Sequence, residues 1–154
     1  MILPRLHDDL ILVATRPAIN CAGLFVVSTL TRWRVQSILV DSVVEVERLV
    51  TNAVKQTGRM VDLPILTDVS RLNFITVRLL RLEHSVAIEV WDVEPDTPTQ
   101  PPPSGTVVNR GSYLEDEGKV VWAELALYPS GNMQSWPREA ERHRWEPSES
   151  GLAT

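Results

Sequence analysis

The stretch ITVRLLRLEHSVAIEVW, residues 75–91, decides the fold of this chain. It consists of two apolar runs rich in β-branched residues, and the polar residues 83–85 separate them. Two such runs joined by a short polar turn are typical of an antiparallel β-hairpin. We therefore predict two paired strands, at residues 75–82 and 86–91.

Asp92 directly follows the second of these strands. It has the same parity as Val86, Ile88 and Val90, which share one face because side chains alternate along a strand. If the strand includes Asp92, its carboxylate lies on the buried face and needs a hydrogen-bond partner there. If the strand ends at Trp91, Asp92 only begins the next turn. The residues alone favour this second interpretation.

Further regular elements are predicted on both sides of the hairpin. Residues 10–15 and 119–127 are apolar and β-branched, as in strands, and we expect the first of them at an edge of the sheet. A helix is predicted from Pro17 to Trp33, because apolar residues recur there at steps of three and four. A second helix is predicted for residues 37–57, ended by Gly58.

The second predicted helix has two different faces. Its expected core stripe consists of Leu39, Val43, Val46, Val50 and Ala53. Its polar face consists of Asp41, Glu45, Arg48, Asn52, Lys55 and Gln56. Because about 100° separates successive residues of a helix, the polar set is predicted to point away from the core.

The order of these elements predicts an α+β fold. We expect a two-layer sandwich in which the helices cover one face of a mostly antiparallel sheet. The proline-rich and acidic residues 94–118 are predicted to form a long extended loop. Residues 1–131 form the predicted domain, and residues 132–154 are predicted to form a polar C-terminal tail.

The composition narrows the classes of function. The chain has 154 residues, 44% of them hydrophobic, which suits one ordinary domain. Its formal net charge of −5 argues against nucleic acid as a partner. A single cysteine excludes an intrachain disulfide and a cysteine-based metal cage. The apolar stretch near the N-terminus is too short to cross a bilayer, so we expect a cytoplasmic protein with no membrane partner.

Three segments carry a specific resemblance to a known family. Residues 47–54, ERLVTNAV, resemble the helix motif ELVTNAV of the GHKL (Bergerat-fold, histidine-kinase-like) ATPases. Residues 86–92 resemble the strand that ends in the adenine-binding aspartate of that family, and residues 118–125, GKVVWAEL, resemble its last strand. The chain is especially similar to the small anti-sigma-factor serine kinases. The resemblance covers most of residues 10–127 and implies the histidine-kinase-like ATPase fold.

The resemblance gives two residues a role. Asn52 matches the asparagine that coordinates Mg²⁺ at the nucleotide phosphates, and Asp92 matches the aspartate that accepts a hydrogen bond from the adenine amino group. It therefore implies Asn52 and Asp92 as cofactor-binding residues, Asn52 as a metal ligand, and ATP with Mg²⁺ as the cofactors.

Two departures from the family pattern are equally informative. Arg48 occupies the position of the catalytic glutamate, and arginine does not act as a base at neutral pH. Glu47 is adjacent, but a shift of one residue turns a side chain by about 100° around a helix. The segment after Asp92 lacks the clustered glycines with which the family's lid holds phosphates. We therefore predict no catalytic residue, and weak or absent ATP binding.

Two hypotheses of function follow. In the first, the chain is a regulatory protein of anti-sigma-factor type that binds a sigma factor or a transcriptional regulator. In the second, it is an ATP-dependent serine/threonine protein kinase with an unorthodox nucleotide site. Arg48 and the missing lid favour the first. The resemblance to dimeric anti-sigma factors also implies a homodimer, and the surfaces that suit one are the apolar first strand and the first helix, where Phe25 and Val27 lie off the core stripe. The alternative is a monomer in which residues 132–154 cover the edge of that strand.

Overall fold

The computed structural model of the chain describes residues 6–58, 72–96, 100 and 106–127. The predicted tail 132–154 and most of residues 97–105 lie outside the described residues. The elements, in chain order, are β1 (Leu6–Val13), α1 (Pro17–Arg32), α2 (Leu39–Thr57), β2 (Phe74–Arg81), β3 (Ser85–Asp92), β4 (Val107–Glu115) and β5 (Gly118–Ala126).

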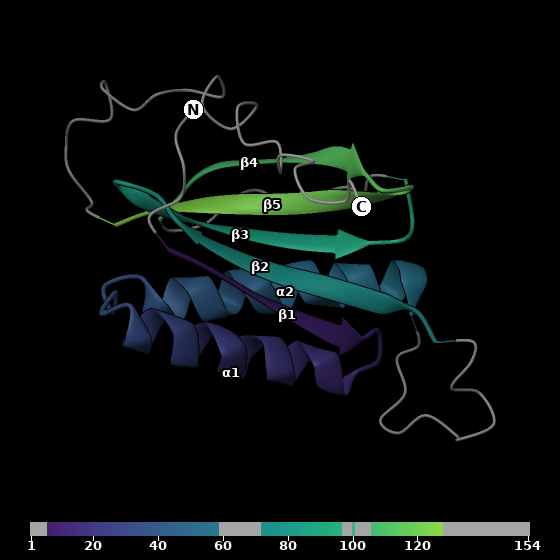
Figure 1. Cartoon of the computed structure of the whole chain (residues 1–154), viewed down its shortest axis with the longest axis horizontal. Coiled ribbons are helices and arrows are strands. Elements are labelled where there is room, and N and C mark those ends of the chain that lie inside the picture. The colour runs from purple at the N-terminus through teal and green to yellow at the C-terminus, as the bar shows by residue number, and fades with distance from the viewer. Residues whose placement is uncertain (1–5, 59–71, 97–99, 101–105, 128–154) are drawn as a thin grey trace, which may run out of the picture.

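The five strands form one sheet in the order β1-β2-β3-β5-β4, and every neighbouring pair is antiparallel. The two helices lie side by side on one face of this sheet (Figure 1). α1 packs against β1, and α2 packs against β3 and β5. The predicted α+β two-layer sandwich is therefore confirmed, and so is the position of the first strand at an edge of the sheet.

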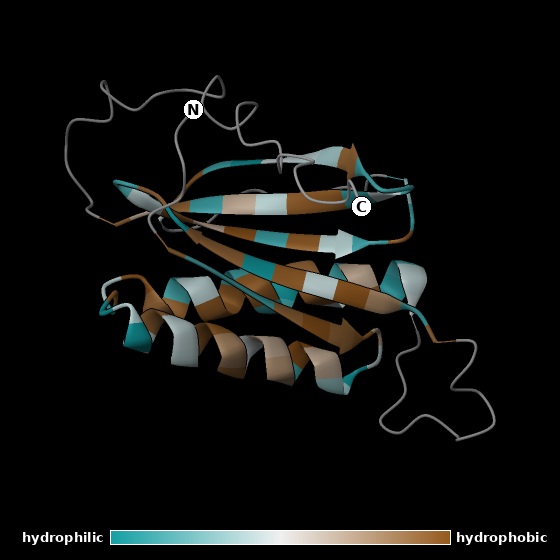
Figure 2. Ribbon diagram, viewed as in Figure 1, coloured by the Kyte–Doolittle hydropathy of each residue, from teal (hydrophilic) through white to brown (hydrophobic). Residues whose placement is uncertain are grey.

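The core lies between the helices and the sheet because each element presents an apolar stripe there. Bands of hydrophobic and more hydrophilic residues are visible along β2 and β5 (Figure 2). From α1, Ala22, Val26 and Leu30 are fully buried at helical spacing. From α2, the fully buried apolar residues include Val46, Val50 and Val54. No helix formed by the described residues is both long enough and apolar enough to span a membrane.

β4 corrects one prediction. Residues 107–115 form a strand, whereas the sequence predicts an extended loop across residues 94–118. The reason is that β4 is only half-buried or exposed along its length and so lacks the apolar run that identifies a strand. Its partner β5 supplies the pairing and part of the packing, because a Cβ on Gly111 would lie only 2.9 Å from the ring of Trp122.

A tight turn joins β4 to β5. Glu115 pairs with Gly118, which leaves a loop of two residues, Asp116 and Glu117. Both have positive φ, 47° and 63°, as a type I′ hairpin turn requires. Aspartate suits the first position of such a turn and glycine the second, so the strain of this turn lies at Glu117.

Candidate functional site

β3 brings Asp92 to the helix-covered face of the sheet. Val86, Ile88, Val90 and Asp92 share that face, and each is at most 1% exposed. β3 includes Asp92, so the interpretation in which the strand ends at Trp91 is wrong. A carboxylate that is buried this completely requires partners, because an unpaired charge in the interior is very costly.

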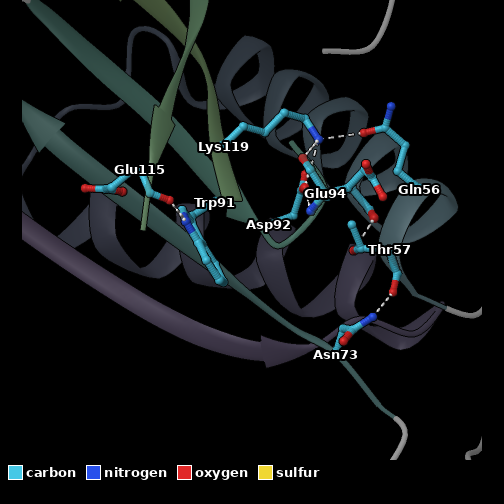
Figure 3. Close-up of polar contacts among 9 residues, drawn as sticks. Gln56, Thr57, Asn73, Trp91, Asp92, Glu94, Glu115 and Lys119 are labelled. Atoms are coloured by element: carbon cyan, nitrogen blue, oxygen red, sulfur yellow. Dashed lines mark hydrogen bonds and ion pairs between the residues drawn. The ribbon is translucent and has the colours of Figure 1, made fainter. Parts of the chain in front are cut away.

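Lys119 is the main partner of Asp92. It lies directly opposite Asp92 in the register of β3 and β5, and it is 1% exposed. Its Nζ donates hydrogen bonds to Asp92 Oδ1 at 2.8 Å, to Gln56 Oε1 at 2.8 Å and to the backbone oxygen of Glu94 at 2.7 Å (Figure 3). An ammonium group has three N–H donors, so these bonds use all of them. We call Lys119, Asp92, Gln56 and Glu94 the Lys119 cluster.

Asp92 also holds the chain that follows it. Its Oδ1 accepts a hydrogen bond from the backbone N–H of Glu94 at 2.9 Å, in addition to the bond from Lys119. Burial raises the pKa of Asp92, and the hydrogen bond and positive charge of Lys119 oppose that rise. Glu94 is thus bound to the cluster through its backbone N–H and its backbone oxygen.

Two glycines let the elements around the cluster approach one another. β5 begins at Gly118, where a Cβ would collide with the backbone oxygen of Asp92. α2 ends next to Gly58, where a Cβ would collide with the backbone oxygen of Ala14, just after β1. The side-chain amide of Asn73 donates to the backbone oxygen of Thr57 (Figure 3). The C-terminal end of α2 is therefore fixed to both halves of the sheet.

The polar side of α2 does not simply face solvent. Glu45 is only 4% exposed, which contradicts its predicted place away from the core. Its charge is compensated by Arg48, which donates to it through Nη2 and, at 3.3 Å, through Nε. Asp41 accepts a hydrogen bond of 2.9 Å from the hydroxyl of Thr106, which precedes β4. This side of α2 consequently lies toward β5 and the approach to β4.

Asn52 is half-buried on that same side of α2. It stands one helical turn before Gln56, and residues four apart lie on one face of a helix. The structure therefore brings Asp92 close to the last turn of α2, through Lys119, which bonds to both Asp92 and Gln56. The residue that bonds to the partner of Asp92, however, is Gln56.

A second ionic cluster lies on the opposite face of the sheet. Arg78 in β2 donates to both carboxylate oxygens of Glu115, at 3.2 and 2.5 Å, and lies 3.5 Å from the carboxylate of Glu89. The hydroxyl of Tyr113 donates to Glu89 at 3.4 Å. Burial opposes the charge of Arg78, but the hydrogen bond to Glu115 and the charge of Glu89 outweigh it and raise the pKa of Arg78. We call these four residues the Arg78 cluster.

Sequence reasoning missed Lys119 and Gln56. Lys119 belongs to the segment that resembles the family's last strand, and it is the one charged residue at the start of a long apolar run. A lysine at the start of β5 and an aspartate at the end of β3 carry opposite charges, which is a signal for a cross-strand pair. Only the register of β3 and β5 shows that the two residues are directly opposite.

Among the described residues, no group of three or more histidine, cysteine, aspartate or glutamate side chains is placed to hold a metal ion. No protein-family model matches the chain, and no curated protein matches it. The geometry of the Lys119 cluster and of α2 is therefore the basis for assigning a function.

Proposed function

We propose that this chain is a non-catalytic regulatory protein of anti-sigma-factor type, built on a histidine-kinase-like ATPase fold whose adenine position is closed by its own lysine. It acts in the cytoplasm by binding another protein, such as a sigma factor or a transcriptional regulator. The observation that carries the proposal is the buried pair of Asp92 and Lys119. Two helices on one face of an antiparallel sheet, with the motif around Asn52 on the second helix, support the fold assignment.

Lys119 competes with adenine for Asp92. In the family that the sequence resembles, this carboxylate accepts a hydrogen bond from the neutral adenine amino group. Here Asp92 Oδ1 accepts from a charged ammonium and from the backbone N–H of Glu94. Hydrogen bonds between charged groups are the stronger kind, and displacing Lys119 would leave a buried charge without its partner. Both facts support weak or absent ATP binding.

The surroundings of Arg48 support the absence of catalysis. Its guanidinium is paired with Glu45, so the nearest carboxylate on this side of α2 is itself held in an ion pair. Glu47, the adjacent carboxylate, lies close to Gly23 of α1, where a Cβ would come within 2.9 Å of its Oε1. Glu47 thus points toward α1, on the other side of α2 from Gln56. A general base must reach the reacting hydroxyl and must be available to take its proton. None of the described carboxylates of α2 meets both conditions.

Titration calorimetry with Mg-ATP tests the closed site. We expect no binding in the low micromolar range for the native chain, because Asp92 Oδ1 already accepts from Lys119 and from the backbone N–H of Glu94, and adenine would compete with that charged pair. The matched control is Asp92→Asn, which removes the charge and keeps the shape. Any weak heat that is the same in both proteins does not come from adenine recognition at Asp92. A low micromolar dissociation constant that is lost in Asp92→Asn would overturn the proposal.

A second measurement separates regulation from kinase activity. The chain is mixed with candidate sigma factors and transcriptional regulators, with and without Mg-ATP carrying a labelled γ-phosphate. We expect a complex whose affinity is the same in both conditions, and no label on the partner. Transfer of the label to a serine or threonine of the partner would establish the protein kinase alternative.

A further inference from the structure

The sheet has a second face, opposite the helices, and part of that face is buried. Both helices lie on the other face, and no described element packs against this one (Figure 1). Ala87 of β3 points to this helix-free face, because it alternates with core-facing residues, and it is paired with Leu80 of β2. Leu80 is 4% exposed, and Trp122 of β5, on the same face, is 7% exposed. We call Leu80, Ala87 and Trp122 the buried sheet patch.

The strands alone do not account for this burial. Ala87 carries a single methyl group, which is too small to cover the leucine beside it. Trp122 rests on Gly111 of β4, where a Cβ would lie 2.9 Å from its ring, and this contact covers one side of the indole. A sheet face without a second layer stays open to water on its outer side. The low exposure of Leu80 and Trp122 therefore requires a segment that covers them from outside.

The covered area does not extend across the whole face. Ile11 on β1 and Phe74 on β2 belong to the same face as Leu80, because residues in register and residues two apart share a face. Ile11 and Phe74 are 67% and 54% exposed. The cover therefore lies over β3, β5 and the adjoining part of β2. It differs in place from the strand edge that the sequence suggests for residues 132–154.

The connection between β3 and β4 is attached to the other side of the sheet. It begins near Glu94, whose backbone oxygen accepts a hydrogen bond from Lys119 in the helix-covered cluster. It ends at Thr106, whose hydroxyl donates to Asp41 of α2. Since both ends are fixed on the helix side, this connection is not the segment that covers the helix-free face.

Two other segments leave from places where the helix-free face is open. Residues 59–71 join the end of α2 to β2 beside Phe74, which is exposed. Residues 1–5 precede β1, whose first residues on this face include the exposed His7. The chain that follows β5 is the remaining candidate for the cover.

The end of β5 lies close to the buried sheet patch. The backbone N–H of Leu127 donates to the backbone oxygen of His84 at 2.9 Å, and His84 is in the turn between β2 and β3. Residues 128–154 follow from this point. An extended chain advances about 3.3 Å per residue, so ten residues of it are about as long as the nine-residue strand β5.

The sequence after β5 is complementary to the helix-free face in its charge. Residues 136–145, WPREAERHRW, have a tryptophan at each end and three arginines against two glutamates between them. The charged residues that β2, β3, β4 and β5 direct to the helix-free face include three carboxylates and one guanidinium, those of Glu89, Glu115, Glu124 and Arg78. Tryptophan and arginine are the residue types that contribute most to buried contacts between surfaces.

We propose that residues 136–145 bind across the helix-free face of the same chain, with their tryptophans against the buried sheet patch and their arginines toward its carboxylates. The cover belongs to the same chain because the patch is buried within a single copy. The helix-free face is thus a docking surface for a segment that carries tryptophan and arginine. This contact does not depend on the regulatory role proposed above.

Paramagnetic NMR on the full chain tests where residues 136–145 bind. A nitroxide is attached through Ala140→Cys, in a Cys21→Ser background because Cys21 is exposed and would also react. In dilute, uniformly ¹⁵N-labelled protein we expect the label to broaden the amide signals of Ala87 and Trp122. The amide signals of Leu24 and Val44, on the outer side of the helices, serve as the control and should stay sharp.

A matched set of variants tests the role of the tryptophans. In the full chain, Trp136→Ser together with Trp145→Ser should remove most of the broadening at Ala87. The same double variant should be cleaved by trypsin after the arginines of residues 136–145 at least about tenfold faster than the native chain, because cleavage follows the population of the undocked segment. Ile11→Ser, on the uncovered part of the face, should change neither result. Circular dichroism checks that the variants are folded.

Four outcomes would overturn the proposal. The first is a label at position 140 that broadens no signal of the sheet. The second is broadening centred on β1, which would place the segment on the strand edge. The third is broadening that persists in the double tryptophan variant. The fourth is equal broadening when the label and the ¹⁵N are on different copies, which would show that a second chain supplies the cover.

Discussion

The Lys119 cluster and the Arg78 cluster occupy opposite faces of one sheet and neutralise buried charge in different ways. In the Lys119 cluster, one ammonium meets one carboxylate and two uncharged oxygens, and the side chains of Lys119 and Asp92 are 1% and 2% exposed. In the Arg78 cluster, one guanidinium meets two carboxylates, and the side chains of Arg78 and Glu115 are 13% and 15% exposed. Both cations bridge elements that are distant in sequence.

The comparison shows where the fold depends on a single charge. The side chain of Asp92 is only 2% exposed, so solvent can compensate little for the loss of the ammonium, and the carboxylate is left buried without its cation. Glu115 retains some exposure, and Glu89 keeps a hydrogen bond from Tyr113. The Lys119 cluster, which is more deeply buried and has fewer charges, is therefore more sensitive to the loss of its cation than the Arg78 cluster.

The largest expected effect is that of Lys119→Met. Methionine has a similar length but no charge, so the packing is largely kept while Asp92 loses its cation. We expect the free energy of unfolding to fall by about 3 kcal/mol. Urea denaturation followed by circular dichroism measures this change.

The matched comparison is Arg78→Met in the other cluster. Because Glu115 is partly exposed and the buried Glu89 keeps its hydrogen bond from Tyr113, we expect a smaller loss, about 1–2 kcal/mol. The double variant Lys119→Met with Asp92→Asn should recover part of the stability that Lys119→Met loses, since it removes the uncompensated charge. If Lys119→Met and Arg78→Met lose the same free energy of unfolding, the difference in burial does not determine how much each cluster stabilises the fold.

The titration of Asp92 is the next prediction. Burial raises its pKa in the folded protein, whereas aspartates in an unfolded chain titrate at a pKa of about 3.9. The folded state therefore holds the proton at pH values where the unfolded chain has released it. By linkage, the contribution of Asp92 to the free energy of unfolding is largest below the unfolded pKa and decreases as the pH rises through the folded pKa.

Carboxyl-carbon NMR measures that titration directly. We expect a midpoint for Asp92 above that of exposed aspartates, and a still higher midpoint in Lys119→Met, because Lys119 is what opposes the rise. The destabilisation caused by Lys119→Met should accordingly shrink as the pH falls and Asp92 becomes neutral. A midpoint that stays the same in the variant would contradict the assignment of Lys119 as the compensating charge.

The smallest predicted effect lies in the turn that connects the clusters. Asp116 and Glu117 form the turn between Glu115, which belongs to the Arg78 cluster, and Gly118, which directly precedes Lys119. Because Glu117 has a φ of 63°, Glu117→Gly should relieve strain and raise the free energy of unfolding by about 0.5–1 kcal/mol. Glu83→Gly, in the loop between β2 and β3, is the control and should be neutral or destabilising. A gain in Glu83→Gly and none in Glu117→Gly would contradict the strained turn.

Much of the architecture could be predicted because it depends on local periodicity. The hairpin of β2 and β3, both helices and β5 all carry strong apolar patterns, and the structure has them close to the predicted residues. β4 was not predictable in the same way, since its residues gain their strand conformation from pairing with β5 and not from an apolar run of their own.

The candidate site was less predictable for a related reason. The parity of Asp92 indicated a buried position, but its burial is tolerable only because Lys119 lies opposite, and a register between strands is a long-range property. Glu45 was assigned to the polar face of its helix because sequence periodicity does not reveal an ion pair that makes burial acceptable. Asn52 and Asp92 remain predicted nucleotide-binding residues, and the calorimetry described above, with Asp92→Asn as control, tests the second of them.

The three acceptors of Lys119 also bear on how the chain folds. They come from α2, from β3 and from the segment that follows β3, while the lysine itself is on β5. A partly assembled state that lacks any one of these pieces must keep the ammonium hydrated, because its charge would otherwise be buried without enough acceptors. The helix, which forms locally, and the strands, which pair over long distances, can therefore reach their final packing only together. A single side chain in this way makes the junction of α2, β3 and β5 one cooperative unit of folding.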